Sequence, residues 1–379
     1  MKSSKKKQSC LKKKILIISR YRIKEKKDYK WFFLKNCETD FDFIYLSYGQ
    51  FLSKNNKKLF IKKLVKILNL NQISLFIDLT FLADLNIKNP IYLENIKFFY
   101  EIRELIKKFN IKSLRFNYPL LTKWDVFPWI YLSPFKFLYK FCQNFFLQEY
   151  YKFPNTDYYC VTGQKSKNEI FKNNIKIHFF PHFDFLINGS NYKKINSKKN
   201  FFVYLDQNYQ FSHDIKIIDY KYEFSTFEEE INNFFLSLKK KLNIDIVIAS
   251  HPKRNLRKKS ILTKNWKVIK GKTTELVANS TAVIAHNSAS INYAVLNKKP
   301  LIFLTTNQLE NSDMFETINS YSKYFEKKKI NVSEINYDNF NFDKSEYLKI
   351  NKKLYDKYIK NFIALNKNKN FKQKIKKII

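Results

Sequence analysis

Polar side chains follow two short apolar runs in the second half of the sequence, and their types suit the binding of a phosphate. After the first run come His251, Pro252, Lys253 and Arg254. After the second come His286, Asn287, Ser288 and Ser290. Hydroxyl groups and the backbone N–H groups at the start of a helix suit a phosphate-sized anion. We therefore take these two segments as candidate ligand-binding loops.

The elements around these loops are predicted from the apolar pattern. Ala282–Ala285 is too short for a helix and suits a buried parallel strand. A helix is predicted from about residue 289 to 297, and Pro300 ends it before a strand over Leu301–Leu304. Ile244–Ala249 is predicted as the strand before the first loop. Both loops would then lie at carboxyl ends of strands, where open α/β sheets bind ligands.

Structural roles are the alternative for the same residues. Ser288 and Ser290 suit the cap of a helix, and a histidine before a proline suits an ordinary loop. The chain has only five histidines, however, and three of them, His213, His251 and His286, follow strand-like runs. This convergence favours a ligand site in which imidazole and hydroxyl groups meet around one phosphate.

Length and composition indicate a globular protein of two domains. The 379 residues include 45% hydrophobic and 18% aromatic residues, and chains of this length usually form two cores. No run of 18 uncharged apolar residues occurs, and the basic start does not read as a signal peptide. The four cysteines are scattered, which favours neither a zinc site nor a disulfide framework. We expect a cytoplasmic protein.

The net charge of +38 can be interpreted in two ways. The chain is rich in Lys, Asn, Ile, Phe and Tyr, which is typical of an AT-rich coding sequence, so much of the lysine excess can be drift on solvated faces. The remaining positive field favours anionic substrates and peripheral contact with an anionic inner membrane. No nucleic-acid-binding motif is visible, so nucleic acid is the less favoured partner.

Strand and helix patterns alternate along the chain, which predicts parallel sheets covered on both faces. The predicted parts are a disordered basic tail at 1–13, a Rossmann-like domain at 14–187, a linker at 188–199, a second Rossmann-like domain at 200–342 and a C-terminal helix and basic tail at 343–379. An amphipathic helix is predicted over Pro134–Tyr151, and a long last helix over about residues 344 to 366.

Three segments together carry a resemblance to a known family: YLDQNYQFSHD at Tyr204–Asp214, HPKRN at His251–Asn255, and the run from Gly271 to Thr306. They resemble bacterial surface-polysaccharide glycosyltransferases of the two-domain GT-B fold. The likeness is closest to capsule and lipopolysaccharide enzymes with an HP motif and paired serines, such as sialyltransferases and polysialyltransferases. The fold class implied is α/β, with two Rossmann-like domains facing across a cleft and a C-terminal helix.

The resemblance implies roles for the loop residues. His251 and Pro252 would contact the phosphate and nucleotide of a nucleotide-sugar donor, and Ser288 and Ser290 would bind the same phosphate. Donors aimed at the departing phosphate speed its loss. Lys253 or Arg254 would add charge. A ribose-binding glutamate is missing near Asn292, which favours a CMP-linked over a UDP-linked sugar.

Other positions are secondary candidates. Asp206, at the end of its strand, is the favoured catalytic base, with Asp78 as a second candidate and a structural cap as the alternative for both. Thr273 is predicted to cap a helix over Thr274–Asn279 while its loop touches the donor. No HEXXH, DxD or CxxC pattern occurs, so we expect no metal and no cofactor.

The sequence thus predicts a metal-independent glycosyltransferase that extends a capsule or lipopolysaccharide chain, with a glycan or lipid-linked acceptor. Two alternatives stay open. One is a polyol-phosphate transferase or sugar-nucleotide epimerase on the same scaffold. The other is a non-catalytic protein that binds anionic glycans or nucleic acid.

Overall fold

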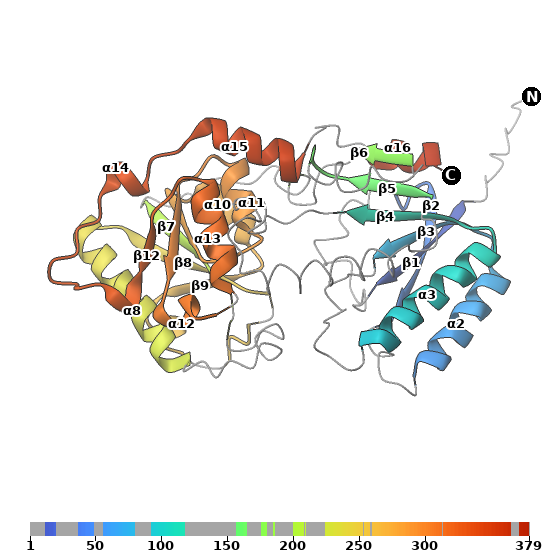
Figure 1. The fold of residues 1–379 in the computed structure, drawn as a ribbon, viewed down its shortest axis with the longest axis horizontal. Helices are drawn as coiled ribbons and strands as arrows, with labels where there is room; N and C mark the ends of the chain where they lie inside the picture. The colour runs from blue at the N-terminus through green and yellow to red at the C-terminus, as the bar shows by residue number, and fades with distance from the viewer. Residues whose placement is uncertain are drawn as a thin grey trace, which may run out of the picture. The chain divides into compact units, whose positions relative to one another are not determined.

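The structure is a computed structural model that describes residues 12–19, 37–48, 56–79, 92–117, 157–164, 176–179, 185, 200–207, 209, 224–252, 254–257, 260–312, 314–364 and 371–378. The chain divides into two compact units. Unit 1 holds β1 to β6 with α2, α3 and α16, and unit 2 holds β7 to β12 with α8 to α15 (Figure 1). The predicted linker at 188–199, residues 1–11 of the predicted tail and the helix predicted over Pro134–Tyr151 lie outside the described residues.

Unit 1 is built on a parallel sheet of six strands in the order β2-β1-β3-β4-β5-β6. The strands are β1 (Lys13–Ser19), β2 (Phe41–Ser47), β3 (Ile73–Leu79), β4 (Lys112–Asn117), β5 (Tyr158–Val161) and β6 (Lys176–Phe179). Helices α2 (Lys57–Leu70) and α3 (Tyr92–Lys108) pack through their apolar stripes against one face of this sheet. The third helix, α16 (Phe371–Ile378), returns to unit 1 from the C-terminal end of the chain, and Lys372 and Lys376 form ion pairs with Asp40.

Unit 2 is built on a second parallel sheet of six strands, in the order β12-β11-β10-β7-β8-β9. The strands are β7 (Phe201–Leu205), β8 (Asp245–Ser250), β9 (Lys267–Lys270), β10 (Ala282–Ala285), β11 (Leu301–Thr305) and β12 (Lys329–Asn331). If the six strands of unit 2 are numbered in chain order, their order across the sheet from the β9 edge is 3-2-1-4-5-6. This is the strand order of dinucleotide-binding Rossmann folds.

Helices cover both faces of the unit 2 sheet because successive strand residues point to opposite sides. Phe202 and Tyr204 of β7 pack with α8 (Phe224–Leu242), while Val203 and Leu205 face α10 (Thr273–Asn279) and α11 (Ile291–Leu296). The first face also holds α9 (Ile261–Asn265), α12 (Asn307–Glu310) and part of α13 (Met314–Tyr324). Every residue of β7 is buried, as expected for a central strand covered on both sides.

The strands predicted around the candidate loops are confirmed. β10 has the predicted bounds, β8 is shifted by one residue at both ends, and β11 is longer by one residue at its C-terminal end. The prediction of one long last helix over about residues 344 to 366 is wrong. The segment instead forms α14 (Lys344–Tyr347), α15 (Lys352–Tyr358) and a π-helical turn at Ile359–Ile363. Asn351 caps α15 through its side chain, because the Leu354 N–H donates to Asn351 Oδ1 at 3.3 Å, and this capped start divides the predicted helix.

Helices in this glycine-poor chain end on residues that have to adopt positive φ. Asn110, Asn243, Lys298 and Glu326 have φ between 50° and 52° within two residues of the ends of α3, α8, α11 and α13. After α11 the Lys299 N–H donates to the Ala294 carbonyl at 2.9 Å and the Lys298 N–H to the Val295 carbonyl at 3.2 Å. This is the two-bond termination that glycine normally supports. Lysine and glutamate tolerate this left-handed region at a cost in free energy.

Candidate functional site

The candidate loops of unit 2 lie where the order of its strands reverses. From β7 the chain moves outward through β8 to β9, then crosses back to β10 on the other side of β7. In open parallel sheets such a switch point opens a crevice at the carboxyl ends of the two central strands, and ligands bind there. Asp206 follows β7 and His286 follows β10, so both lie at the carboxyl edge of the sheet at this switch point.

The register places the first loop at the same edge. Leu205 of β7 pairs with Ala249 of β8, and Tyr204 pairs with Ile284 of β10. The three strands therefore end at nearly the same level. Because neighbouring strands lie about 4.8 Å apart, the backbones that lead into His251 and Ser288 start about 10 Å from each other. Side chains of this size can reach one phosphate from such positions.

A buried cluster of three charges lies beneath the His251 loop. The Arg254 guanidinium donates to both carboxylate oxygens of Asp206, through Nε to Oδ2 at 2.6 Å and through Nη2 to Oδ1 at 3.1 Å. Its Nη1 and Nη2 also donate to Glu228 Oε1, each at 3.2 Å. The Arg254 and Asp206 side chains are 9% and 3% exposed. Burial at this level is tolerated because the cation is shared between two carboxylates.

This cluster fixes the backbone of the loop. The His251 N–H donates to Asp206 Oδ2 at 3.1 Å, and the Arg254 N–H donates to the His251 carbonyl at 3.0 Å, which closes a turn over residues 251–254. Lys270 Nζ donates to the Arg254 carbonyl at 2.8 Å. His251 itself is half-buried. The loop is therefore held from three strands before any ligand binds.

The geometry assigns Asp206 and Arg254 to positioning. A catalytic base needs a carboxylate that can reach substrate, whereas the Asp206 oxygens accept from Arg254 and from the His251 backbone. Catalysis by Asp206 stays a prediction that this arrangement does not favour. Arg254, which was expected as an alternative to Lys253 to add charge at the site, directs its guanidinium to two carboxylate partners. The sequence analysis missed Glu228, whose signal is an acid on the apolar stripe of α8, in helical register with Ile231 and Phe235.

His286 is a core histidine rather than an exposed ligand. It is completely buried, and its Nδ1 lies 2.7 Å from the Leu304 carbonyl oxygen while its Nε2 lies 3.0 Å from the Tyr204 hydroxyl. Since a carbonyl only accepts, Nδ1 carries the proton and Nε2 accepts from Tyr204. Burial lowers the pKa of His286 to about 4. The imidazole is therefore neutral and ties β7, β10 and β11 together at the carboxyl edge of the sheet.

Aromatic rings surround His286 and connect it to the second loop. Tyr209 and Phe227 contact the imidazole with ring centroids 5.7 and 5.6 Å away. The Tyr209 hydroxyl donates to Asn287 Oδ1 at 3.0 Å. Asn287 is thus oriented by a residue that follows β7, across the switch point. The sequence analysis did not single out Tyr209, because a tyrosine in a polar loop has no distinctive spacing.

The paired serines lie in a turn that leads into α11. Ser288 is 7% exposed, and its Oγ accepts the Ser290 N–H at 3.2 Å. The N–H groups of Ile291, Asn292 and Tyr293 donate to carbonyls of residues 288 to 290. The expectation that the first N–H groups of this helix serve an anion is therefore wrong for residues 290 to 293. The Ser288 hydroxyl still has its own proton to donate.

The remaining predicted residues are distributed as follows. The prediction that Thr273 caps a helix is wrong, because Thr273 is the first residue of α10. Lys272 occupies the N-cap position and forms no side-chain hydrogen bond there. Pro252 is exposed at the loop surface. Lys253 and His213 lie outside the described residues, and for Asp78 only the backbone, in β3, is described.

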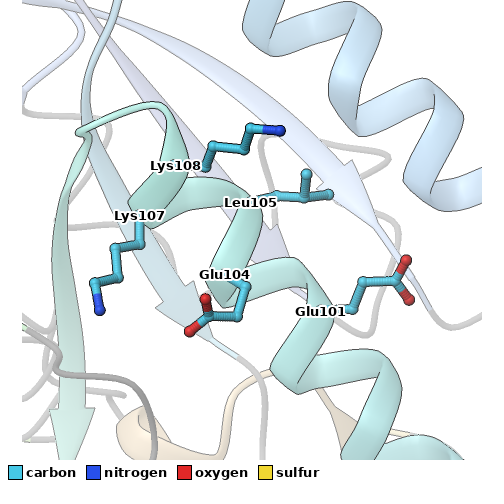
Figure 2. A pocket seen from close by; sticks show the side chains of 5 residues that line it. All are labelled: Glu101, Glu104, Leu105, Lys107 and Lys108. Atoms are coloured by element: carbon cyan, nitrogen blue, oxygen red, sulfur yellow. The ribbon is translucent and has the colours of Figure 1, made fainter.

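A shallow hollow in unit 1 does not involve the predicted site. It is lined by Glu101, Glu104, Leu105, Lys107 and Lys108, all from α3, so two acidic and two basic side chains share it with one leucine (Figure 2). Over the described part of the chain, no three His, Cys, Asp or Glu side chains gather as a metal site would require. In that same part, no helix is long and apolar enough to cross a bilayer.

Comparisons with known proteins identify the fold. No family model and no curated protein matches the chain. Among solved structures, the glycosyltransferase SnogD from Streptomyces nogalater matches with 7% identity over 97% of this chain and 100% of its own, at a TM-score of 0.51. The wall teichoic acid polymerase TagF matches with 15% identity over 97% of this chain and 89% of its own, at 0.50. A sialyltransferase from Photobacterium phosphoreum matches with 14% identity over 86% and 99%, at 0.48.

At these identities the likeness shows the fold. Together with the two parallel sheets, it confirms the predicted α/β class with two Rossmann-like domains of the GT-B type. The cleft between the domains stays a prediction.

Proposed function

We propose that the chain is a glycosyltransferase that transfers a sugar from a nucleotide-activated donor. The observation that carries the proposal is the switch point of unit 2, whose strand order is that of nucleotide-binding folds and where the segments after β7, β8 and β10 leave the sheet at the same edge. The GT-B-type fold shared with a solved glycosyltransferase and a solved wall teichoic acid polymerase agrees with it.

In this proposal the loops supply the groups that face the donor phosphate. The His251 imidazole, the Ser288 and Ser290 hydroxyls and the Asn287 amide bind the phosphate, and Pro252, Lys253 and Thr273 border the nucleotide. Hydrogen-bond donors aimed at the phosphate stabilise the charge that develops as the glycosidic bond breaks. Asp206, Arg254 and His286 hold these groups in place from below. No metal takes part in the proposed reaction.

A CMP-linked donor is the favoured choice, and the proposed acceptor is a growing glycan or lipid-linked chain of a capsule or lipopolysaccharide. The absence of a carboxylate between Ala289 and Ala294 of the printed sequence argues against the ribose contact typical of UDP-sugar enzymes. Transfer would take place on the cytoplasmic side of the inner membrane.

Thermal unfolding in the presence of nucleotides tests the proposal directly. A ligand that binds the native state raises the melting temperature, by an amount set by its concentration relative to Kd. We expect CMP to raise it more than UDP or CDP, and we expect His251→Ala and Ser288→Ala to remove the shift. Ser345→Ala changes an exposed serine in α14; it is the matched control and should keep the shift. Equal shifts in all variants would disprove the site.

Product analysis separates the alternatives. A glycosyltransferase releases nucleotide only when an acceptor is present, apart from slow hydrolysis, and His251→Ala abolishes that release. An epimerase converts the sugar without any acceptor, and a polyol-phosphate transferase uses a CDP-linked polyol. A non-catalytic anion binder shows salt-sensitive affinity that is indifferent to Ser288.

A further inference from the structure

The outer face of α2 in unit 1 combines lysines with exposed leucines. Its solvent-exposed residues are Lys58, Leu59, Lys62, Lys63, Lys66, Asn69 and Leu70. Leu59 and Leu70 are 55% and 69% exposed, which makes them the most exposed large hydrophobic residues of the described chain. The helix sequence, KKLFIKKLVKILNL, contains no acidic residue. The face is therefore cationic and partly apolar.

The helix geometry aligns these side chains into one ridge. Leu59 and Leu70 are eleven positions apart, so at 3.6 residues per turn they differ by only about 20° around the axis and by about 16 Å along it. By the same spacing, Lys62, Lys63 and Lys66 lie between them within about 60° of that line. The ridge thus has a leucine near each end and cations in its middle.

The core of unit 1 fixes which way this ridge points. Phe60, Leu64 and Leu68 on the opposite side of α2 are at most 4% exposed and pack into the cluster that α2 shares with α3 and the sheet. Rotation of α2 that would bury the leucines would expose these three side chains. The exposed ridge is therefore a consequence of stable packing.

Two other helices that carry exposed lysines differ from α2 in chemistry. On α3 the exposed lysines Lys107 and Lys108 share their surface with Glu101 and Glu104 (Figure 2). On α8 Lys239 pairs with Asp245 at 3.2 Å and lies over the Trp266 ring. A general excess of lysine explains these helices, but it does not explain two exposed leucines aligned with uncompensated charge.

We propose that the outer face of α2 docks unit 1 on an anionic lipid bilayer. Lysines near such a surface gain attraction to its charge, and leucines on the same face gain by entering the boundary between headgroups and acyl chains. A polyanion such as RNA would use the lysines but offers no apolar layer to the leucines. The proposal rests on the proposed function only in that a lipid-linked acceptor would be presented at the same membrane.

Vesicle co-sedimentation of the full chain tests this surface. Vesicles of phosphatidylcholine alone are compared with vesicles that also contain phosphatidylglycerol, at low and high salt. We expect binding only to the second kind. Lys62→Gln with Lys66→Gln should weaken it at least ten-fold, because each lysine near an anionic surface contributes roughly five-fold. Leu59→Ser with Leu70→Ser should weaken it several-fold and leave its salt dependence in place.

A matched control removes the same charge elsewhere. Lys352→Gln with Lys353→Gln takes two exposed lysines from α15, outside the proposed surface. Vesicle binding should stay within roughly two-fold of wild type, because salt screens charges that do not contact the bilayer. An equal loss in this control, or no loss in the leucine variant, would overturn the proposal. So would α2 variants that lose binding to poly-uridine RNA but keep binding to vesicles.

The donor assay keeps the two proposals separate. Nucleotide-induced thermal shifts are measured on the same α2 variants and should match wild type, since α2 belongs to unit 1 and the candidate site to unit 2. Wild-type protein that shows no nucleotide shift but binds anionic vesicles through α2 would contradict the proposed function alone.

Discussion

Removal of the Arg254 guanidinium should destabilise unit 2 more than any other single charge change at the candidate site. In Arg254→Met the side chain keeps a similar length, but five hydrogen bonds are lost, to Asp206, Glu228 and Ser260. Two buried carboxylates then lie beside each other without a cation. The folded state has to desolvate both negative charges and bear their mutual repulsion.

The size of the effect follows from burial. Breaking a buried ion pair by removing one partner costs about 3–5 kcal/mol, and Arg254 and Asp206 are among the least exposed charged side chains of the described residues. At roughly 2–4 °C per kcal/mol for a unit of this size, the melting temperature of unit 2 should fall by about 6–20 °C. Arg254→Lys should lie between wild type and Arg254→Met, because lysine keeps the charge without the planar fork.

The assay is unfolding in denaturant, monitored through the hydrogen exchange of peptides from β7 and β8, because these peptides report on unit 2 alone. Arg257→Met, an exposed arginine of the same loop region, is the control and should change stability by about 0.5 kcal/mol at most. A variant that combines Arg254→Met with Asp206→Asn and Glu228→Gln should recover most of the loss, because no buried charge remains. The reasoning fails if Arg254→Met stays within about 1 kcal/mol of wild type or if the triple variant is no better.

Three further predictions concern the same unit. The pKa of His286 is lowered to about 4 in the folded chain and stays near 6.5 in the unfolded chain, so between these values the unfolded chain binds an extra proton. The free energy of unfolding should therefore be at its full value above pH 6.5 and about 2 kcal/mol lower at pH 5. In a measured curve of stability against pH, His286→Gln should remove this loss. Lys298→Gly and Glu326→Gly should each raise stability by about 1 kcal/mol in denaturant titrations, since both residues hold positive φ; a loss in either would show that side-chain contacts outweigh the backbone. Tyr209→Phe should lower the free energy of unfolding by about 1 kcal/mol, because it removes the hydrogen bond to Asn287, and it should weaken nucleotide-induced thermal shifts. Unchanged shifts would show that Asn287 does not bind the nucleotide.

The sequence alone was sufficient for the strands around the candidate loops and for the place of those loops. Buried parallel strands are short, continuous apolar runs, so Ala282–Ala285 and its neighbours could be read directly. Pro300 marks the boundary before β11 because proline cannot continue a helix. Polar residues after such strands must lie at the carboxyl edge of the sheet. These local and directional rules do not depend on which strands pair.

The tertiary structure decided what each polar residue does. Nothing in the sequence separates the roles of Arg254 and His286 from those of the polar residues beside them. In the structure, Arg254 neutralises two buried carboxylates, and His286 bridges Tyr204 and Leu304. Their partners come from strands and helices distant in the chain, and only the order of the strands brings them together. Burial then determines protonation, because a charge removed from water needs a partner within hydrogen-bond distance, and spacing along the chain does not specify that partner.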